Sequence, residues 1–307
     1  MEAFRKVNSQ GEFHQSFKSQ SAMEYLMTYG WAILIIAVVL AALFELGIFN
    51  PLTFAPKASP GSCQVVRPEG AGTTNFISLE GECNGELPQY VGYFNGNAYI
   101  NGSLGGGFDT GTPVSITLTA WVSSKGPVPE VAVGPVSYGC TSGLYEAGLN
   151  TISSNDTRYH GCCDDYAASP FTGLNLYGGN WYFVALSYSD VTHTIIFVVN
   201  NNVQTDGVTF ASNQLGGLNF WIGRDMCDKW FLTGYMSNLQ VYNTALSAND
   251  LESLYQEGIG GAPINVQSLV GWWPLNGNAN DYSGNGNNGV PSGITYTSNW
   301  YSGYSAP

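Results

Sequence analysis

One apolar stretch near the amino terminus limits what this chain can fold into. Residues 25–44 are twenty residues without a charge, bounded by Glu24 and Glu45, and no proline interrupts them. At a rise of about 1.5 Å per residue, a helix of that length spans about 30 Å, the thickness of the hydrocarbon core of a bilayer. Tyr25 and Trp31 lie near its start, where aromatic side chains favour a membrane–water interface. The stretch predicts a helix able to enter a membrane.

The residues around this stretch indicate how such a helix is used. A secretory signal carries small residues of the A-x-A type after its apolar region, but residues 50–53 are NPLT. The sequence KSQSAMEY at residues 18–25 instead resembles an archaeal type IV pilin-like (class III) signal sequence. The resemblance implies that a prepilin-type peptidase cuts between Ser19 and Gln20, although Ser19 stands where glycine is commoner. Residues 1–19 would then be a leader peptide.

Under this resemblance Glu24 becomes the fifth residue of the processed chain. Type IV pilins use a glutamate at that position in assembly, so the resemblance implies self-association through a helix at residues 20–49. A carboxylate at the edge of a membrane helix is costly to bury unless it is paired. The new terminal ammonium of Gln20 in one subunit would neutralise Glu24 of a neighbour. The alternative is a solvated flanking charge at the membrane surface.

Charge restricts the partners and the orientation of the chain. The formal net charge is −13, with nine Lys and Arg residues, three of which precede Gln20. Nucleic acid is excluded as a partner because no basic patch is present to neutralise phosphates. Basic residues before the helix favour the inner side of a membrane. We therefore expect a membrane-inserted chain whose remaining residues are extracellular, at the cell surface or in a filament.

Cysteine usage agrees with an oxidising exterior. All six cysteines follow the apolar stretch: Cys63, Cys83, Cys140, Cys162, Cys163 and Cys227. Six cysteines allow fifteen pairings, and we expect the local pair Cys63–Cys83. A loop of that size contributes about 3 kcal/mol to stability. A metal site around His160 and its neighbouring cysteines is an alternative, although the C-x₂-C spacing typical of zinc ligands is absent.

The composition of the remaining sequence is typical of β structure. Residues 50–62 contain three prolines, which favour an extended linker. Residues 114–122 and 181–188 are rich in β-branched and aromatic side chains. Residues 194–199 precede three asparagines and predict a strand that enters a tight hairpin.

Turns and one helix complete the local predictions. The Asn-Gly steps at Asn95 and Asn101 predict turns between strands. Residues 245–257 predict the one helix of this region, with Ser247 as its cap and Gly258 at its end.

A second resemblance rests on several motifs in order. They are residues 91–100, 115–122, 180–186, 220–223, 231–242 and 245–258. Their succession resembles a laminin-G-like, concanavalin A-like jelly roll. The resemblance implies a mainly β fold, in which the amino-terminal helix is followed by an antiparallel β-sandwich over residues 63–307.

The end of the chain departs from that pattern. Residues 269–289 resemble the opening segment of the same family, yet here they come last. We therefore expect residues 269–307 to complete the sandwich, through circular permutation or in a neighbouring chain. Trp272 and Trp273 fall on opposite faces of a strand, so we expect one to be buried and the other partly open.

The sequence contains few candidate catalytic, metal-binding or modification sites. The E-x-D-x-x-E pattern of concanavalin-type glucanases is absent, so no catalytic residues are assigned and the chain is expected not to be an enzyme. Asp281, Asn285 and Asn287 form an oxygen-rich loop that suits Ca²⁺, or equally tight turns. Asn101 and Asn155 begin N-x-S/T sequons and are candidate glycosylation sites if the domain is outside the cell.

Two functions remain from the sequence. The first is a subunit of a type IV pilus-like surface filament that displays a lectin-like head for adhesion. The second is a membrane-anchored protein that never polymerises and that binds, or hydrolyses, glycans. Cleavage before Gln20 separates the two, because it frees a new terminus for assembly.

Overall fold

The structure is a computed structural model of the chain. It describes residues 13–46, 54–105, 115–125, 130–133, 147–153, 156–159, 171–172, 176, 178–189, 191–207, 219–224 and 231–307. The chain divides into two compact units, Met1–Ala55 and Pro56–Pro307.

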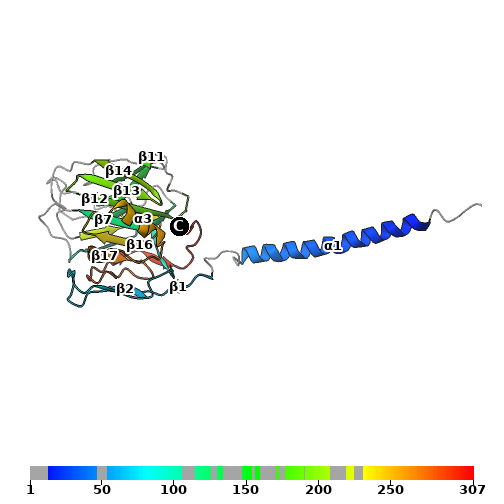
Figure 1. The fold of residues 1–307 in the computed structure, drawn as a ribbon, viewed down its shortest axis with the longest axis horizontal. Coiled ribbons are helices and arrows are strands. Elements are labelled where there is room, and N and C mark those ends of the chain that lie inside the picture. Colours follow the sequence, from blue (N-terminus) through cyan, green and yellow to red (C-terminus); the bar gives the residue numbers. More distant parts are fainter. Residues whose placement is uncertain are drawn as a thin grey trace, which may run out of the picture. The chain divides into compact units, whose positions relative to one another are not determined.

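A long helix makes up most of the described part of the first unit (Figure 1). Helix α1 runs over Phe13–Glu45, so it begins before Gln20 and includes the apolar stretch predicted to be helical. Its Met27–Glu45 segment has a mean hydropathy of 2.3, and none of it is buried within the chain. A helix that is apolar all round is stable when lipid or other helices surround it.

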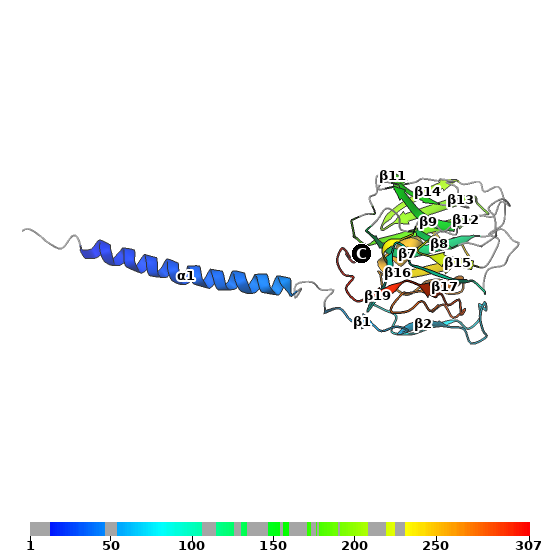
Figure 2. The same cartoon turned by 180° about the vertical axis from the view of Figure 1, so that it is seen from behind.

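Among the described residues, two large antiparallel sheets and two small ones form the second unit (Figures 1 and 2). The strands of the first large sheet are β6 Tyr99–Ser103, β8 Glu130–Val133, β9 Ala147–Ser153, β10 Asp156–Tyr159, β11 Phe171–Thr172, β15 Asn219–Ile222 and β18 Val290–Ser292. Those of the second are β5 Val91–Asn95, β7 Ile116–Ser124, β12 Tyr182–Ser189, β13 Thr194–Val199, β14 Asn202–Gly207, β16 Thr233–Tyr242, β17 Leu269–Trp273 and β19 Thr295–Thr297. The small sheets pair β1 Lys57–Ala58 with β4 Leu87–Pro88, and β2 Cys63–Val66 with β3 Ser78–Gly81.

Within the described residues, the first large sheet has seven strands in the order β11-β10-β9-β8-β15-β6-β18. The second has eight, in the order β14-β13-β12-β7-β16-β5-β19, with β17 paired to β16. The core lies between the sheets and contains Phe94, Leu118, Phe197, Phe220 and Trp273, all 0% exposed. Alternate residues of a strand face opposite sides, so each sheet also presents an outer face. The predicted antiparallel sandwich is confirmed.

Of the hairpin and turns predicted in this unit, the hairpin and one turn are confirmed and one turn is wrong. The hairpin is confirmed, because β13 and β14 pair up to Val199 and Asn202. The Asn95-Gly96 step is a turn as predicted, and it leads from a strand of the eight-stranded sheet into one of the seven-stranded sheet. The predicted turn at Asn101 is wrong, because Asn101-Gly102 lies inside β6. A Cβ atom on Gly102 would lie 2.4 Å from the Phe220 ring, so close packing explains this glycine.

The expected linker at residues 50–62 is partly sheet. Lys57–Ala58 form β1, and the backbone N–H of Gln89 donates to the Ala58 carbonyl at 3.2 Å. Proline favours the extended backbone that a short edge strand also needs, so both structures suit this sequence.

The segment at residues 269–307 supplies strands to both large sheets of its own chain. Strand β17 pairs with β16, β18 with β6, and β19 with β5. Its apolar side chains are buried, including Leu269 at 2% and Leu275 at 0% exposure. This sheet pairing is the one that the sequence leads us to expect for the end of the chain.

Helix α3, Ala248–Gln256, lies in front of β7 and β16 in Figure 1. The Ser247 side chain accepts from the backbone N–H of Asp250, and the Asp250 carboxylate accepts from the backbone N–H of Ser247. Gly258 follows with φ +78°, a left-handed conformation that suits glycine at a helix end. The predicted helix, cap and stop are confirmed.

Candidate functional site

The residues predicted for processing and assembly lie on α1. Ser19, Gln20 and Glu24 fall within Phe13–Glu45, and their side chains are outside the described ones. Within the part of the chain that the structure describes, Met27–Glu45 is the one segment long and apolar enough to cross a membrane. Cleavage at Gln20 and pairing of Glu24 stay predictions.

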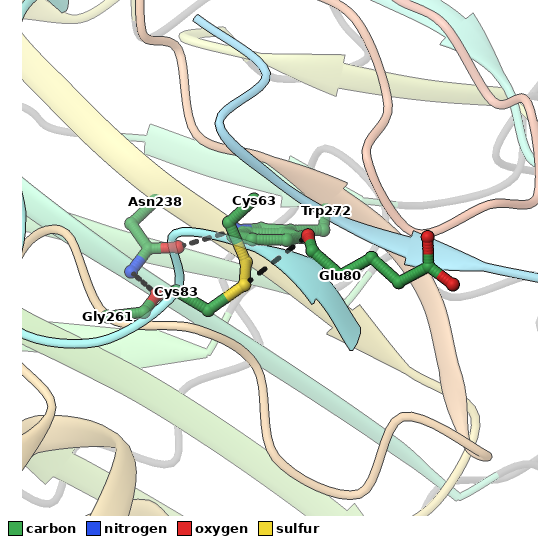
Figure 3. The surroundings of a disulfide bond; sticks show 6 residues. All are labelled: Cys63, Glu80, Cys83, Asn238, Gly261 and Trp272. Atoms are coloured by element: carbon green, nitrogen blue, oxygen red, sulfur yellow. Dashed lines mark hydrogen bonds between the residues drawn. A yellow bond between two sulfur atoms is a disulfide. The ribbon is translucent and has the colours of Figure 1, made fainter. Parts of the chain in front are cut away.

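The predicted disulfide is present. Cys63, at the start of β2, is bonded to Cys83, just after β3, and closes a loop with a sequence separation of 20 (Figure 3). The disulfide joins the first residues of the two-stranded sheet to the segment that leaves it. The other four cysteines, together with His160 and Asn155, lie outside the described residues.

Trp272 lies beside this disulfide and is held by Asn238 (Figure 3). The Trp272 indole N–H donates to the Asn238 side-chain oxygen at 2.8 Å, and the Asn238 amide donates to the Gly261 carbonyl at 2.8 Å. Asn238 has φ +53° and sits where the register of β16 shifts between Ser237 and Gln240. The bulge therefore aims a polar side chain at the tryptophan.

This arrangement corrects one prediction. Trp272 is 3% exposed and Trp273 is 0% exposed, so both are buried although they face opposite sides of β17. Trp273 packs in the core against Phe220, with ring centroids 4.6 Å apart. The expectation of a partly open tryptophan is wrong, because the segment around Cys63 covers the outer side of β17.

A small pocket remains between Trp272 and the disulfide. Cys63, Asn238, Asn276 and Trp272 contribute to its lining, and its volume is about 40 Å³. A water needs about 10–15 Å³ on this measure, whereas ligand sites usually have several hundred cubic ångströms. The pocket suits a few waters and is too small for a sugar ring.

The proposed calcium ligands hold the closing segment together. Asp281 Oδ1 accepts from the backbone N–H groups of Trp272 at 2.9 Å and Ser283 at 2.8 Å. Asp281 Oδ2 accepts from the backbone N–H of Asn287 and from the Ser283 hydroxyl, both at 2.8 Å. Each carboxylate oxygen therefore already accepts two hydrogen bonds from the protein.

The two asparagines of the loop are used in the same way. Asn285 Oδ1 accepts from the backbone N–H of Gly72, and Asn287 Oδ1 from that of Gly105, both at 2.9 Å. Both amide groups donate to the Val270 carbonyl at 2.9 Å. Within the described ranges, no group of three His, Cys, Asp or Glu side chains suits a metal ion. Calcium binding by Asp281, Asn285 and Asn287 stays a prediction.

Arg67 ties β2 to the same segment. Its side chain is 8% exposed and donates to the carbonyls of Ser283 at 2.9 Å, Val266 at 2.7 Å and Leu269 at 2.9 Å. Burial lowers the pKa of Arg67, and the negative charge of Asp281 opposes that shift. The guanidinium is a structural cation whose donors are used inside the protein.

The chain end and α3 cover much of the outer face of the eight-stranded sheet. Trp121 is 1% exposed, and its ring centroid lies 5.9 Å from that of Tyr255 and 5.4 Å from that of Tyr304. Trp300 is also 1% exposed, and its carbonyl accepts from the Trp181 indole N–H at 2.8 Å. Burial raises the pKa of Tyr304. The chain itself therefore covers Trp121 and Trp300 on this part of the face.

One end of that face stays open. Tyr93 of β5 and Tyr235 of β16 are directly opposite each other, half-buried, with ring centroids 5.2 Å apart. The Trp181 ring is stacked 6.2 Å from that of Tyr235. We call Tyr93 and Tyr235 the tyrosine pair. Sequence reasoning missed it, although residues 91–95 and 231–237 have the alternation that places these rings on one face.

The predicted sequon at Asn101 lies on the opposite sheet. Asn101 is exposed on β6 and faces outward, so its amide is open to modification. Glycosylation at Asn101 stays a prediction.

The two packed antiparallel sheets define a β-sandwich of the jelly-roll class. Residues 94–252 match the model of the concanavalin A-like lectin/glucanases superfamily. This match covers just over half of the chain, which therefore belongs to that family. The laminin-G-like, concanavalin A-like resemblance is thereby confirmed.

Solved structures are similar to this chain at low identity. A Bacteroides ovatus protein, provisionally assigned to carbohydrate binding, has a TM-score of 0.50 and 18% identity over 72% of this chain and 67% of its own. A heptameric SAP-like pentraxin from Limulus polyphemus has a TM-score of 0.46 and 15% identity over 67% and 94%. The CBM40 domain of the Ruminococcus gnavus IT-sialidase, bound to α2,3-sialyllactose, has a TM-score of 0.37 and 14% identity over 47% and 84%. No curated protein matches the chain.

Proposed function

We propose that the chain is a carbohydrate-binding surface protein whose apolar helix assembles it into a type IV pilus-like filament for adhesion. The observation that carries the carbohydrate-binding part is the half-buried tyrosine pair on the outer face of a sandwich from a lectin-containing family. Aromatic rings offer an apolar face to the C–H groups of a sugar, and polar neighbours can bond its hydroxyls.

Helix α1 supports the surface part of the proposal. Its Met27–Glu45 segment is apolar and unburied within the chain, so it requires lipid or other helices around it. The resemblance at residues 18–25 favours assembly, in which Gln20 of one subunit pairs with Glu24 of the next. The Cys63–Cys83 disulfide supports an oxidising location for the sandwich.

Binding without hydrolysis is part of the proposal. A glycosidase needs two carboxyl groups placed on either side of the scissile bond. The E-x-D-x-x-E pattern that supplies them in concanavalin-type glucanases is absent from this sequence. We therefore expect glycans to be bound and released unchanged.

Two measurements test the proposal. Purified full-length chain in detergent is applied to a glycan array, and absence of any bound glycan would contradict carbohydrate binding. Sheared surface material is then examined by electron microscopy and by mass spectrometry of the chain's amino terminus. We expect filaments whose subunits start at Gln20.

A pair of glutamate variants separates assembly from anchoring. Glu24→Gln should leave the chain in the membrane without filaments, because the charge pair between subunits is lost. Glu45→Gln, at the other end of the apolar stretch, is the matched control and should assemble normally. Chains that keep Met1, form no filaments and still bind glycans would instead show the alternative, a membrane-anchored glycan-binding protein.

A further inference from the structure

The open end of the eight-stranded sheet carries more than the tyrosine pair. Thr233 of β16 stands opposite Asn95 of β5, and Lys125 follows β7 in the neighbouring position. Alternation along the strands places these three residues on the same outer face as the tyrosine pair, one step along the sheet. Asn95 and Lys125 are exposed, and Thr233 is half-buried.

Lys125 is held over one of the rings. Its ammonium lies 5.0 Å from the centroid of the Tyr235 ring and donates to the Tyr235 hydroxyl at 3.3 Å. Its backbone N–H donates to the Thr233 carbonyl at 2.8 Å, which fixes the start of the side chain. An ammonium has three donors, so two remain for a ligand after the bond to Tyr235.

The other described cations of the sandwich are placed differently. Lys57 lies over the rings of Trp300 and Tyr301. Arg67 is buried and donates hydrogen bonds to backbone carbonyls. Arg224 stacks on Tyr99, 4.1 Å from the ring centroid, on the other sheet. Lys125 is the exposed cation among the described side chains of the β unit.

We propose that this end of the sheet binds an acidic saccharide, whose ring packs on Tyr93 beside Tyr235 and whose carboxylate is bound by Lys125. The inference rests on the carbohydrate-binding function proposed above and names the site and the ligand class. Asn95 and Thr233 lie beside the rings, where amide and hydroxyl groups bond sugar hydroxyls.

The charge of the chain makes Lys125 decisive. A formal net charge of −13 repels an anionic ligand. At physiological salt, charges beyond a Debye length of about 8 Å are largely screened, so a cation in contact with the ligand dominates at the site. A lysine bonded to the hydroxyl of Tyr235, next to the ring that the sugar contacts, therefore selects carboxylated over neutral glycans.

The test uses full-length chain in detergent and two probes. The carboxylated oligosaccharide that binds most strongly on the array is titrated by calorimetry beside its carboxyl-methyl ester, which has the same ring without the charge. We expect the free acid to bind about tenfold or more tightly than the ester, a difference of about 1.4 kcal/mol. The preference should shrink at high salt.

Variants assign the site. Lys125→Gln should reduce binding of the acid to that of the ester, and Tyr93→Ala should weaken both probes. The matched controls are Arg224→Gln and Tyr99→Ala, a second tyrosine–cation pair on the opposite sheet, and both should bind as the parent does. Circular dichroism and thermal melting confirm that each variant is folded.

The failures are distinguishable. Glycan binding that prefers the acid equally in Lys125→Gln and its parent would overturn the assigned site and leave the proposed function standing. Binding of neutral glycans alone would overturn the acidic ligand class. A parent chain that binds no glycan on the array would overturn both this inference and the proposed function.

Discussion

Replacing Asp281 by asparagine tests what holds the closing segment to the sandwich. The change keeps the size of the side chain but turns one acceptor oxygen into an NH₂ donor. If the NH₂ group takes the place of Oδ1, it faces the backbone N–H groups of Trp272 and Ser283. If it takes the place of Oδ2, it faces the backbone N–H of Asn287 and the Ser283 hydroxyl. Hydrogen bonds to a charged group contribute about 1.5–3 kcal/mol each, so we expect a loss of about 3–5 kcal/mol.

The assay is urea and thermal unfolding of the parent and of Asp281→Asn, each in EDTA and in excess CaCl₂. For a unit of this size the expected loss lowers Tm by about 10 °C. Asp206→Asn, the same change on the exposed strand β14, is the control and should move Tm little. A loss under about 1 kcal/mol in EDTA would refute the structural role of Asp281.

The same experiment decides the calcium prediction. If Asp281 acts only through its hydrogen bonds, Asp281→Asn lowers the free energy of unfolding equally in EDTA and in CaCl₂. This is the result that we expect. A carboxylate that binds calcium makes the parent more stable in CaCl₂, because a ligand that binds the folded state stabilises it. A loss confined to CaCl₂ would then assign Asp281 to a metal site.

Three further changes test other parts of the sandwich. Cys63→Ser with Cys83→Ser should cost about 3 kcal/mol in urea unfolding, the value for a loop with a separation of 20; an unchanged midpoint would contradict it. Tyr296→Phe should raise the free energy of unfolding by about 1 kcal/mol at pH 7, because the hydroxyl is buried without a hydrogen-bond partner in the described part of the chain. Burial raises the pKa of Tyr296 to about 12 from 10.0, so this tyrosine ionises at lower pH in the unfolded chain than in the folded one. Its contribution to stability is therefore full below pH 10 and is lost between pH 10 and about 12. In pH-dependent melts the phenylalanine variant should lose less stability than the parent over that range. Gly102→Ala should cost about 1–3 kcal/mol, because its Cβ would lie 2.4 Å from a core ring, whereas Gly207→Ala, with nothing within 4 Å, should be tolerated.

Sequence patterns of short range determined much of this protein. Twenty uncharged and mostly apolar residues at 25–44 predict a helix that lipid or other helices surround, and α1 covers them. Ser247 and Gly258 fix the ends of α3, because caps act within one helical turn. The disulfide between Cys63 and Cys83 was predictable because a short loop brings its ends together easily. The jelly-roll class followed from aromatic strands that occur in a recognisable order.

Tertiary structure decided what each face of those strands meets. Trp272 is buried because the segment around Cys63 packs over it, a contact that strand alternation cannot predict. The oxygens at Asp281 suit a calcium loop by composition, but the fold directs backbone N–H groups at them. Tyr93 and Tyr235 are far apart in the sequence and become neighbours because β5 pairs with β16 in one register. Alternation determines which side of a strand a residue faces, and the packing of distant segments determines whether that side is core, cover or open surface.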